Sequence, residues 1–441
     1  MKHKSYSQYK PSGVEWLGDV PGHWDVKRAG LGFSIQLGKM LQPEPSSLDD
    51  EQVPYLKALH VQWENIDTSD MPVMWASSYE LLKYAVQKGD LLVCEGGEAG
   101  RAGMLKDIDE AVIIQNALHR VRSKTNSTLF LMYMLKLASE NKWFEILCNK
   151  ATIAHFTGEK FAALRIPYPP FHEQQAIASY LDHETGRIDT LIGKKQKFVE
   201  LLKERRTALI SRAVTKGLNQ KVKMKPSGVE WLGDVPEPWD VKKFTRDIGF
   251  QEGPGIMAAD FQDEGTPLLR IRNIQGKTVE LENCNYLDPI KVEATWKHFK
   301  CKKGDFLISG SASTGLVCEV TDEAAGSIPY TGIIRLWPAN KTIDKDFIRW
   351  IVSSDLFDSQ ISIYQAGSTI QHFGPEHLRK MCIPLPPLFE QQAIATFLDR
   401  ETVKIDMLMD KVETAVERLK EYRSALISAA VTGKIDVREA A

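Results

Sequence analysis

The chain has 441 residues, more than one ordinary hydrophobic core serves, so we expect two or more domains. Charged residues make up 26% and hydrophobic residues 43%, the balance of a soluble folded protein. No apolar run approaches the ~20 residues that span a bilayer, and the N-terminal segment lacks an apolar signal core. We therefore expect a cytoplasmic protein without a membrane segment. The net charge of −2 shows no global preference for nucleic acid, so such binding would depend on local basic faces.

The first element is a short segment rich in Trp, Gly and Pro that occurs twice. Residues 10–28 read KPSGVEWLGDVPGHWDVKR and residues 225–243 read KPSGVEWLGDVPEPWDVKK, with 16 of 19 positions identical. This composition predicts a compact loop pinned by buried aromatic rings rather than a helix or a strand. We interpret the segment as an anchor that packs on a helix, with direct ligand contact as the alternative.

The regions that follow, residues 29–165 and 244–382, align weakly but share landmarks. Their short apolar runs between Gly, Pro and Asp predict strands, while residues 129–147 and 347–364 predict helices. Each region should be a mixed domain on one scaffold with its own surface, which suggests two different targets. The matching landmarks are PYLKALHVQ (54–62) with PLLRIRNIQ (267–275), KGDLLV (88–93) with KGDFLI (303–308), IIQNALHRV (113–121) with IPYTGIIRL (328–336), and TIAHFT (152–157) with TIQHFG (369–374).

A long segment closes each half of the chain. Residues 166–217 and 383–434 align without a gap and are identical at 31 of 52 positions, so the whole chain is a tandem duplication. Each copy begins with a proline pair, followed by EQQAIA, which predicts a helix start. The sequences DHET (182–185) and DRET (399–402) predict a break and a new N-cap. We therefore expect a short helix followed by a long one in each copy.

Both long helices show an apolar heptad seam, which in the first copy also contains Lys195, Arg205 and Arg212. Over equal 45-residue windows the first copy has 9 basic and 6 acidic residues and the second has 7 and 8, or +3 against −1. Opposite charge favours pairing of the two helices with each other; the alternative is that each packs only on its own domain. The seam residues are Ile188, Leu191, Phe198, Leu202, Leu209, Ile405, Leu408, Val412, Leu419, Tyr422 and Leu426.

The order of the repeats has two geometric consequences. A helix of 30–40 residues is ~45–60 Å long. An antiparallel pair of that length would hold the two variable domains further apart than one ~34 Å turn of duplex DNA. For the two halves to be equivalent, the N-terminal Trp segment must fold back on the end of the second helix. We therefore expect a circular pseudo-two-fold arrangement, with close chain termini and Trp16 near Val431.

Catalytic motifs are not found in the sequence. GSASTGL (310–316) lacks the lysine of a phosphate-binding loop, and no zinc-protease, EF-hand or paired zinc motif occurs. YPPF (168–171) is similar to the Asn/Asp-Pro-Pro-Tyr/Phe motif of amino methyltransferases, but Tyr168 cannot accept hydrogen bonds from an amine as that polar residue does. The second copy reads LPPL, so we interpret both as helix starts. The six cysteines form no CxxC pair, which indicates reduced thiols rather than a metal or disulfide framework.

Local basic character in the variable regions supplies the candidates for DNA contact. Lys and Arg contact phosphates without sequence preference, whereas Arg can read guanine and Asn adenine in the major groove. RIRNIQ (270–275) is the strongest candidate, because strand alternation would place Arg270 and Arg272 on one face. The alternative is that such patches are solvated surface. The candidates are Lys57, His60, Arg101, His119, Arg120, Arg122, Arg270, Arg272, Asn273, Lys277, Lys300, Lys302 and Lys303.

The doubled EQQAIA…LD.ET..ID.L helix preceded by IP.PP resembles the conserved region of type I restriction–modification specificity subunits. The doubled GVEWLGDVP..W segment and the KGD and TI.HF landmarks are similar to parts of their target-recognition domains. The resemblance covers nearly the whole chain. It implies an α+β fold with two mixed α/β target-recognition domains, residues 1–165 and 218–382. Two long antiparallel helical regions, residues 166–217 and 383–441, would separate them.

The resemblance also implies a function and partners. Each target-recognition domain would read half of a bipartite site in double-stranded DNA, and the helices would set the spacer and dock two methyltransferase subunits. Two motor-nuclease subunits would join them, and these partners would bind S-adenosylmethionine, ATP and Mg²⁺. The chain itself would be a non-catalytic subunit without a cofactor or metal. The alternatives are a helical scaffold that binds no nucleic acid, and an enzyme with an unrecognised site.

Overall fold

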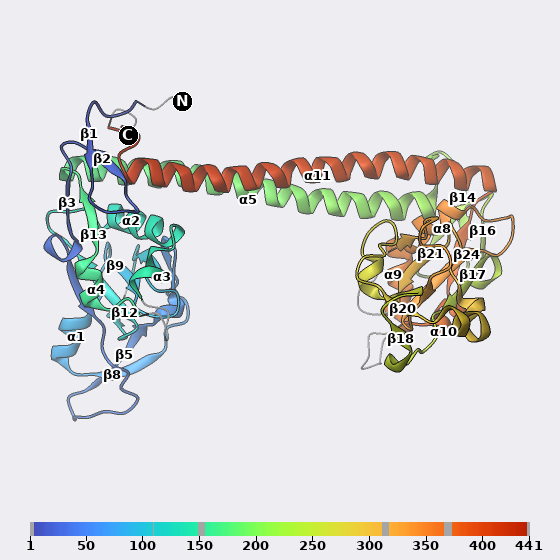
Figure 1. Cartoon of the computed structure of the whole chain (residues 1–441), viewed down its shortest axis with the longest axis horizontal. Coiled ribbons are helices and arrows are strands. Elements are labelled where there is room, and N and C mark those ends of the chain that lie inside the picture. The colour runs from blue at the N-terminus through green and yellow to red at the C-terminus, as the bar shows by residue number, and fades with distance from the viewer. Residues whose placement is uncertain (1–3, 109, 149–154, 311–316, 366–372, 439–441) are drawn as a thin grey trace. The chain divides into compact units, whose positions relative to one another are not determined.

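The computed structural model (Figure 1) describes residues 4–108, 110–148, 155–310, 317–365 and 373–438. The chain forms two compact units, one of Met1–Lys195 with Thr414–Ala441 and one of Gln196–Glu413. Each unit contains one mixed domain and a half of each of two long helices. The landmark residues 152–154 and 369–372, and residues 311–316 of the GSASTGL segment, lie outside the described residues.

The domain of the first unit is built on a four-stranded antiparallel sheet in the order β10-β9-β12-β4. Strand β9 is a continuous apolar run, buried throughout, as expected of a central strand. A second sheet has the order β11-β5-β8, with β11 parallel to β5. The strands are β1 (Tyr9–Pro11), β2 (Asp19–Pro21), β3 (Asp25–Arg28), β4 (Ser34–Leu37), β5 (Glu51–Leu56), β6 (Val61–Gln62), β7 (Asn65–Ile66), β8 (Val73–Ala76), β9 (Leu91–Cys94), β10 (Ala102–Met104), β11 (Ile113–Ile114), β12 (Leu118–Arg122) and β13 (Arg165–Tyr168).

The domain of the second unit repeats this arrangement. Its four-stranded sheet has the order β17-β24-β21-β22, and a second sheet has the order β18-β20-β19-β23, with β23 parallel to β19. The KGD landmarks lead into the corresponding strands β9 and β21, which confirms one scaffold for both domains. The strands are β14 (Met224–Pro226), β15 (Asp234–Pro236), β16 (Asp240–Lys243), β17 (Ile248–Glu252), β18 (Phe261–Gln262), β19 (Thr266–Leu269), β20 (Asn285–Leu287), β21 (Phe306–Ser309), β22 (Val317–Glu319), β23 (Ile328–Pro329), β24 (Ile333–Pro338) and β25 (Cys382–Leu385).

Each of the two ranges predicted to be one helix, residues 129–147 and 347–364, contains two helices. The first breaks at Lys142, whose φ of 55° is left-handed, and the second breaks at Ser353 and Ser354. Buried side chains of α2 pack on the four-stranded sheet, and those of α8 do the same in the second unit. The domain helices are α1 (Ser78–Tyr84), α2 (Thr128–Glu140), α3 (Trp143–Leu147), α4 (Gly158–Ala163), α6 (Phe244–Asp247), α7 (Pro289–Lys291), α8 (Lys345–Val352), α9 (Asp355–Gln365) and α10 (Pro375–Lys380).

The two long helices are α5 (Phe171–Lys216, 46 residues) and α11 (Leu388–Val431, 44 residues). Neither is interrupted, so the predicted short helix followed by a long one is wrong. The side chains of Thr185 and Thr402 are buried and donate to the carbonyls of Leu181 and Leu398, four residues back. A threonine bonded in this way sits within a helix rather than at its start.

The helices pack on each other within each unit, which confirms their pairing. In the first unit the Arg423 guanidinium of α11 bonds Asp189 of α5, and in the second unit Arg206 of α5 bonds Asp406 of α11. The N-terminal half of each helix therefore faces the C-terminal half of the other, so the packing is antiparallel. Each helix supplies both an Arg and an Asp, so the pairing does not depend on the net charges from which it was predicted.

Four of the eleven predicted seam residues are wrong by one position. The set Ile188, Leu202, Ile405, Val412 and Leu426 is buried, with Leu209 and Leu419 partly buried, as predicted. The other residues are exposed. The predicted seam steps three residues and then four, whereas the buried positions step four and then three, so every second contact lies one residue later, as at Val199 and Val416. The predicted seam residues that lie on the exposed side are Leu191, Phe198, Leu408 and Tyr422.

The two Trp segments are anchors, as predicted. Trp24 and Trp239 are fully buried, and their indole Nε1 atoms donate to Glu173 and Glu390 in the first turns of α5 and α11. The segments contain the short strands β1 to β3 and β14 to β16, which the loop prediction missed.

The fold-back of the N-terminal segment is confirmed within the first unit. The ring of Trp24 lies beside Gly433, which follows α11, and the Tyr9 hydroxyl donates to the Gly433 carbonyl at 3.0 Å. Trp16 packs on the same large core cluster that includes Val431, and direct proximity of these two residues stays a prediction. Asp436 N donates to the Lys4 carbonyl at 2.8 Å, which ties the two described ends of the chain together.

Candidate nucleic-acid interface

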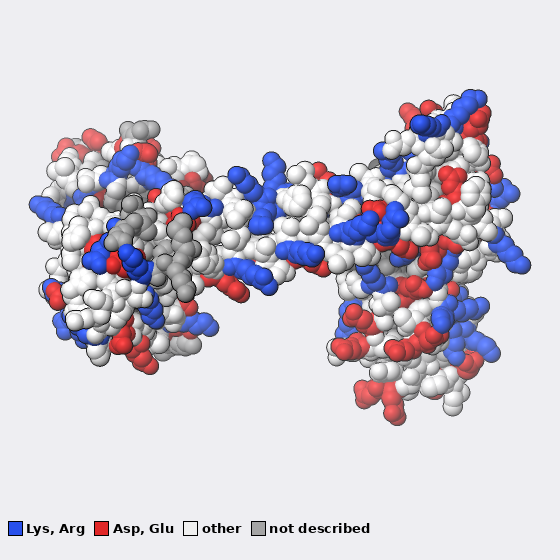
Figure 2. Space-filling view, turned by 90° about the horizontal axis from the view of Figure 1, so that it is seen from above, with Lys and Arg blue, Asp and Glu red and all other residues white. Residues whose placement is uncertain are grey.

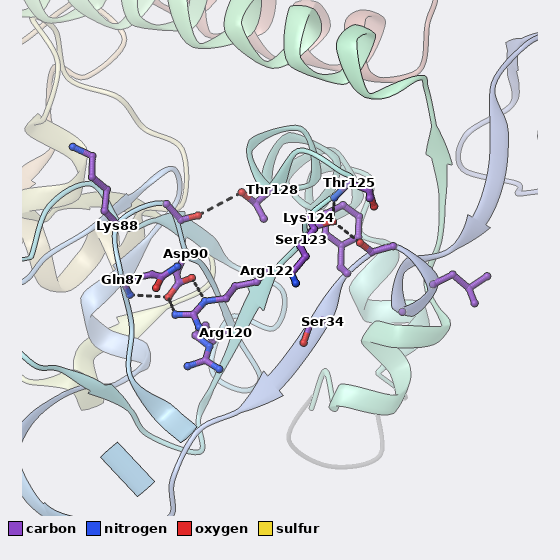
Figure 3. A pocket seen from close by; sticks show the side chains of 15 residues that line it. Ser34, Gln87, Lys88, Asp90, Arg120, Arg122, Ser123, Lys124, Thr125 and Thr128 are labelled. Atoms are coloured by element: carbon purple, nitrogen blue, oxygen red, sulfur yellow. Dashed lines mark hydrogen bonds and ion pairs between the residues drawn. The ribbon is translucent and has the colours of Figure 1, made fainter. Parts of the chain in front are cut away.

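A basic hollow in the first unit is lined by two of the predicted DNA contacts, Arg120 and Arg122 (Figure 3). It lies between the Gly30–Ser34 segment, the KGD turn and the end of β12, and has a volume of about 800 Å³. Arg120 and Arg122 line it, as do Lys88 and Lys124. Both lysines are exposed, and the hydroxyl-bearing residues Ser34, Ser123, Thr125 and Thr128 also line the hollow. Ammonium and hydroxyl groups are donors suited to phosphate oxygens.

The two arginines of this hollow are held by the protein itself. Arg122 forms a two-contact pair with Asp90, from Nε at 2.5 Å and from Nη2 at 2.7 Å, while Arg120 donates to the Ala85 carbonyl. Asp90 in turn accepts from the Gln87 backbone N at 2.8 Å. These bonds fix the KGD turn against β12, so the two arginines brace the hollow and the lysines are its exposed charges.

The second unit repeats this brace, which the sequence search missed. Arg335 on β24 donates to the Lys300 carbonyl, the equivalent of the bond from Arg120, and lies 3.6 Å from Asp305 of the KGD turn. Burial raises the pKa of Asp305 above its ordinary value. The available signal was the alignment of IIQNALHRV with IPYTGIIRL, which places Arg335 opposite Arg120.

Three predicted DNA contacts, His60, His119 and Asn273, lie in the protein interior. The ring of His119 is fully buried and bonds the Phe156 carbonyl, with burial lowering its pKa. His60 accepts from the Lys57 backbone N at 3.0 Å, and Asn273 donates to the carbonyls of Glu280 and Glu282. Their polar atoms bond other groups of the protein, so the structure does not expose these three residues for contact with DNA. Residue type alone did not separate a turn-forming His or Asn from an exposed one.

The RIRNIQ segment is not the strand that was predicted. Residues Ile271–Ile274 form a 3₁₀ turn after β19, so Arg270 and Arg272 do not share a strand face. Arg270 is exposed and lies over the Tyr330 ring at 5.5 Å. Arg272 is also exposed and donates to the Asn283 carbonyl. The two can present charge on the surface, but not as one alternating pair.

The remaining predicted contacts fall into two groups. Arg101 is mostly buried and bonds Glu98 and the Ala58 carbonyl, so it braces a turn. Others lie at the surface, where Lys300 pairs with Glu293 and Lys303 with Asp322. Surface pairs of this kind are weak, and a phosphate can replace the acidic partner. The group at or near the surface comprises Lys57, Lys300, Lys302 and Lys303.

Lys277, which was predicted to contact DNA, lies beside a long helix. Its Nζ lies 3.7 Å from Asp406 on α11, beside the Arg206–Asp406 pair. At the aligned position of the first unit, Glu64 bonds Arg423 of α11. Glu64 and Arg423 were not among the predicted site residues. The alignment of PYLKALHVQ with PLLRIRNIQ marks the position, because its next two residues place Glu64 opposite Lys277.

Charge is mixed over the surface. Figure 2 shows Lys and Arg side chains interspersed with Asp and Glu on both domains and along the helices, without one continuous basic face in that view. Among the described residues, no three His, Cys, Asp or Glu side chains are grouped so as to hold a metal ion. No helix in this part of the chain has the length and apolarity needed to cross a membrane.

Comparison with known proteins decides the family. A model of the type I restriction modification DNA specificity domain matches residues 77–200 and 238–418, one stretch in each half of the duplication. The chain belongs to this family. Each matched stretch combines part of a variable domain with part of a long helix, so the specificity-subunit family has the same two components as the duplicated halves.

Relatives of this specificity subunit match either nearly all of the chain or about half of it. The type I restriction enzyme MjaVIII specificity subunit of Methanocaldococcus jannaschii is 25% identical over 433 residues, covering 95% of this chain and 94% of the relative. The EcoKI specificity subunit of Escherichia coli is 27% identical over 216 residues, covering 46% and 44%.

Solved structures share the fold. The HsdS subunit of Thermoanaerobacter tengcongensis matches with a TM-score of 0.56 at 14% identity, over 94% of this chain and 98% of that one. A chain from a study of complex assembly and conformational transition of the type I R-M system matches with a TM-score of 0.72, over 93% and 98%. These likenesses, with α5 packed on α11, confirm the α+β fold.

Proposed function

We propose that this specificity subunit reads a bipartite site in double-stranded DNA, one half with residues 1–165 and the other with residues 218–382. One observation carries the proposal. The two domains repeat the same sheet order and the same internal Arg–carbonyl brace, but differ in their exposed residues. A shared frame with different surfaces suits two readers of different sequence.

The long helical regions, residues 166–217 and 383–441, set the spacer and dock two methyltransferase subunits. The support is an exposed apolar side of each helix, which includes Leu191 and Phe198 on α5 and Met407 and Leu408 on α11. Exposed apolar surface along a helix suits a partner protein. Two motor-nuclease subunits join through the complex, and S-adenosylmethionine, ATP and Mg²⁺ bind to these partner subunits. The chain acts in the cytoplasm, where its DNA substrate lies.

The proposal is tested by exchanging one reading domain. Residues 29–164 are replaced by those of a relative, which keeps the β3–β13 ladder intact because Arg28 pairs with Arg165 at its end. Modified bases are then mapped in DNA from cells with the complete system. One half-site should change and the other should persist. A simultaneous change of both half-sites contradicts two independent readers.

The helical scaffold that binds no nucleic acid makes a different prediction. The complete complex would then retain random and selected duplexes equally and would show no steep salt dependence. A DNA reader loses affinity with a slope of about −0.9 per neutralised phosphate. Incubating the purified chain alone with DNA and cofactors tests the enzyme alternative, for which methylation or cleavage by the isolated chain is required.

A further inference from the structure

The Arg–Asp pairs of the helices have charged neighbours from the variable domains, and the charge differs between the two units. Arg206 and Arg423 occupy matching positions in the helix repeat, as do Asp189 and Asp406. Each unit therefore contains the same Arg–Asp pair across α5 and α11, which we call the helix socket. In the first unit a domain carboxylate meets its Arg, and in the second a domain ammonium meets its Asp.

The first contact is close and shielded. Both Glu64 carboxylate oxygens accept from Arg423 Nη2, at 2.8 and 2.7 Å, while Lys136 of α2 also bonds the Glu64 carboxylate. The side chains of Arg423 and Lys136 are 12% and 15% exposed, so solvent screens these pairs only partly. Burial alone would raise the pKa of Glu64, but the charges of Lys136 and Arg423 outweigh it and lower that pKa.

The backbone at this contact is unusual. Glu64 follows Trp63 in the tight connection between β6 and β7 and has a φ of 70°, a left-handed conformation that is uncommon for a non-glycine residue. Its backbone N donates to the Ala102 carbonyl at 2.9 Å, and Trp63 packs on the main core of the unit. A short, held turn therefore presents the Glu64 carboxylate to the helix socket.

The second contact is open. Gly276 stands at the position of Trp63, and Ser353 stands at the position of Lys136. A cavity of about 590 Å³ lies here, lined by Arg206, Lys277 and Ser353 among others. The Lys277 side chain is 80% exposed and its Nζ is 3.7 Å from Asp406, so this contact is looser than that of Glu64.

We propose that Glu64 and Lys277 are positioning residues, each fastening one reading domain to its helix socket, and that the socket accepts a domain residue of either charge. An Arg–Asp pair offers a cation and an anion side by side, so an acid can dock on one member and a base on the other. This inference rests on the proposed function: if each domain reads one half-site, its orientation on the helices limits the spacer lengths that both domains can span. The Glu64 contact is the stricter of the two, because it is shielded and Glu64 has two cationic partners, Arg423 and Lys136.

The test uses the complete complex and duplexes that it selects from a random pool. Binding is measured to each selected duplex with its spacer unchanged, shortened by one base pair or lengthened by one base pair. Glu64→Gln removes the charge without changing shape. We expect it to reduce discrimination against the altered spacers by about fivefold, equivalent to about 1 kcal/mol, with half-site preference unchanged. Asp25→Asn is the matched control, since it also removes one negative charge from the first unit, but from an exposed pair with Lys27.

A second variant tests the acceptance of either charge. Lys277→Glu combined with Ser353→Lys rebuilds the Glu64–Lys136 arrangement on the Arg206–Asp406 socket. We expect this variant to sharpen spacer discrimination, whereas Lys277→Ala should relax it. If the rebuilt variant behaves like Lys277→Ala, the socket does not accept either charge.

The outcomes separate the two proposals. Binding by the unmodified complex without any sequence preference contradicts the proposed function, not the fastening. Hydrogen exchange of residues 61–66 then decides, because fastening predicts faster exchange there in Glu64→Gln than in Asp25→Asn. The fastening is contradicted if the complex with folded Glu64→Gln discriminates between spacer lengths as well as the unmodified complex does. Glu64 would then not be a positioning residue.

Discussion

The indole Nε1 of Trp24 donates to Glu173 Oε1 at 3.1 Å, and that of Trp239 donates to Glu390 Oε2 at 2.9 Å. In both units the Trp ring also lies against the glycine that follows the other long helix, Gly433 or Gly217. The start of one helix, the end of the other and a Trp anchor therefore meet in each unit. The N-terminal and C-terminal segments of the chain together supply in the first unit what the linker after α5 supplies in the second.

Replacing the carboxylate of this anchor should affect the two units unequally. Glu173 is buried and also accepts from Tyr6 and His23, so Glu173→Gln should lower the free energy of unfolding by about 2 kcal/mol. Because Glu390 is partly exposed, Glu390→Gln should lower the free energy of unfolding by only about 1 kcal/mol. Thermal unfolding measures both. Glu200→Gln, an exposed change on α5, serves as the control, and equal losses at Glu173 and Glu390 would contradict the difference in burial.

Acid should loosen the contact between Glu64 and the helix socket. The folded-state pKa of Glu64 is lowered, so its contribution to stability is present above the unfolded-state pKa and disappears as the pH falls through the folded value. Unfolding measured from pH 7 down to about pH 3 should therefore show a smaller loss of stability in Glu64→Gln than in the unmodified chain. Identical pH profiles would show that the carboxylate gains nothing from Arg423 and Lys136.

The proposed spacer role requires paired changes in the two helices. Arg206–Asp406 and Asp189–Arg423 fix the register, so removing seven residues from α5 alone would displace one pair. Removing residues 195–201 and 411–417 together keeps the heptad phase and both pairs. The preferred spacer should shorten by about 10 Å, or about three base pairs, with unchanged half-sites. Mapping of modified bases measures the spacer, and a changed half-site would contradict the separation of the two roles.

Neutralising the exposed lysines of the hollow should weaken binding without changing sequence preference. Lys88→Gln with Lys124→Gln removes two candidate phosphate contacts, so the salt slope should fall by about 2. Lys27→Gln with Lys223→Gln is the control, because both lysines lie outside the hollow and pair with local acids at the surface. A lost half-site preference with an unchanged slope would instead indicate that Lys88 and Lys124 read bases.

The sequence by itself determined the duplication, the fold class and the pairing of the long helices. Two repeats in the same order require equivalent structures, and the position of the Trp segments required the N-terminal segment to fold back on the end of the second helix. The landmark strands were predictable because continuous apolar runs such as that of β9 have few other stable environments.

The tertiary structure decided which polar residues are free. His60, His119 and Asn273 were candidates for DNA contact from the sequence, but each bonds a carbonyl that the fold brings near from a distant segment or a turn. The helix seam was fixed by contacts across α5 and α11, since one heptad pattern fits two adjacent stripes of apolar residues. Likewise, nothing in the sequence distinguishes Glu64 and Lys277 from other charged residues as contacts of the long helices. Only the folded chain sets each of them against an opposite charge on α11, Arg423 or Asp406, more than 100 residues away. Charge acts through distance in space rather than along the chain.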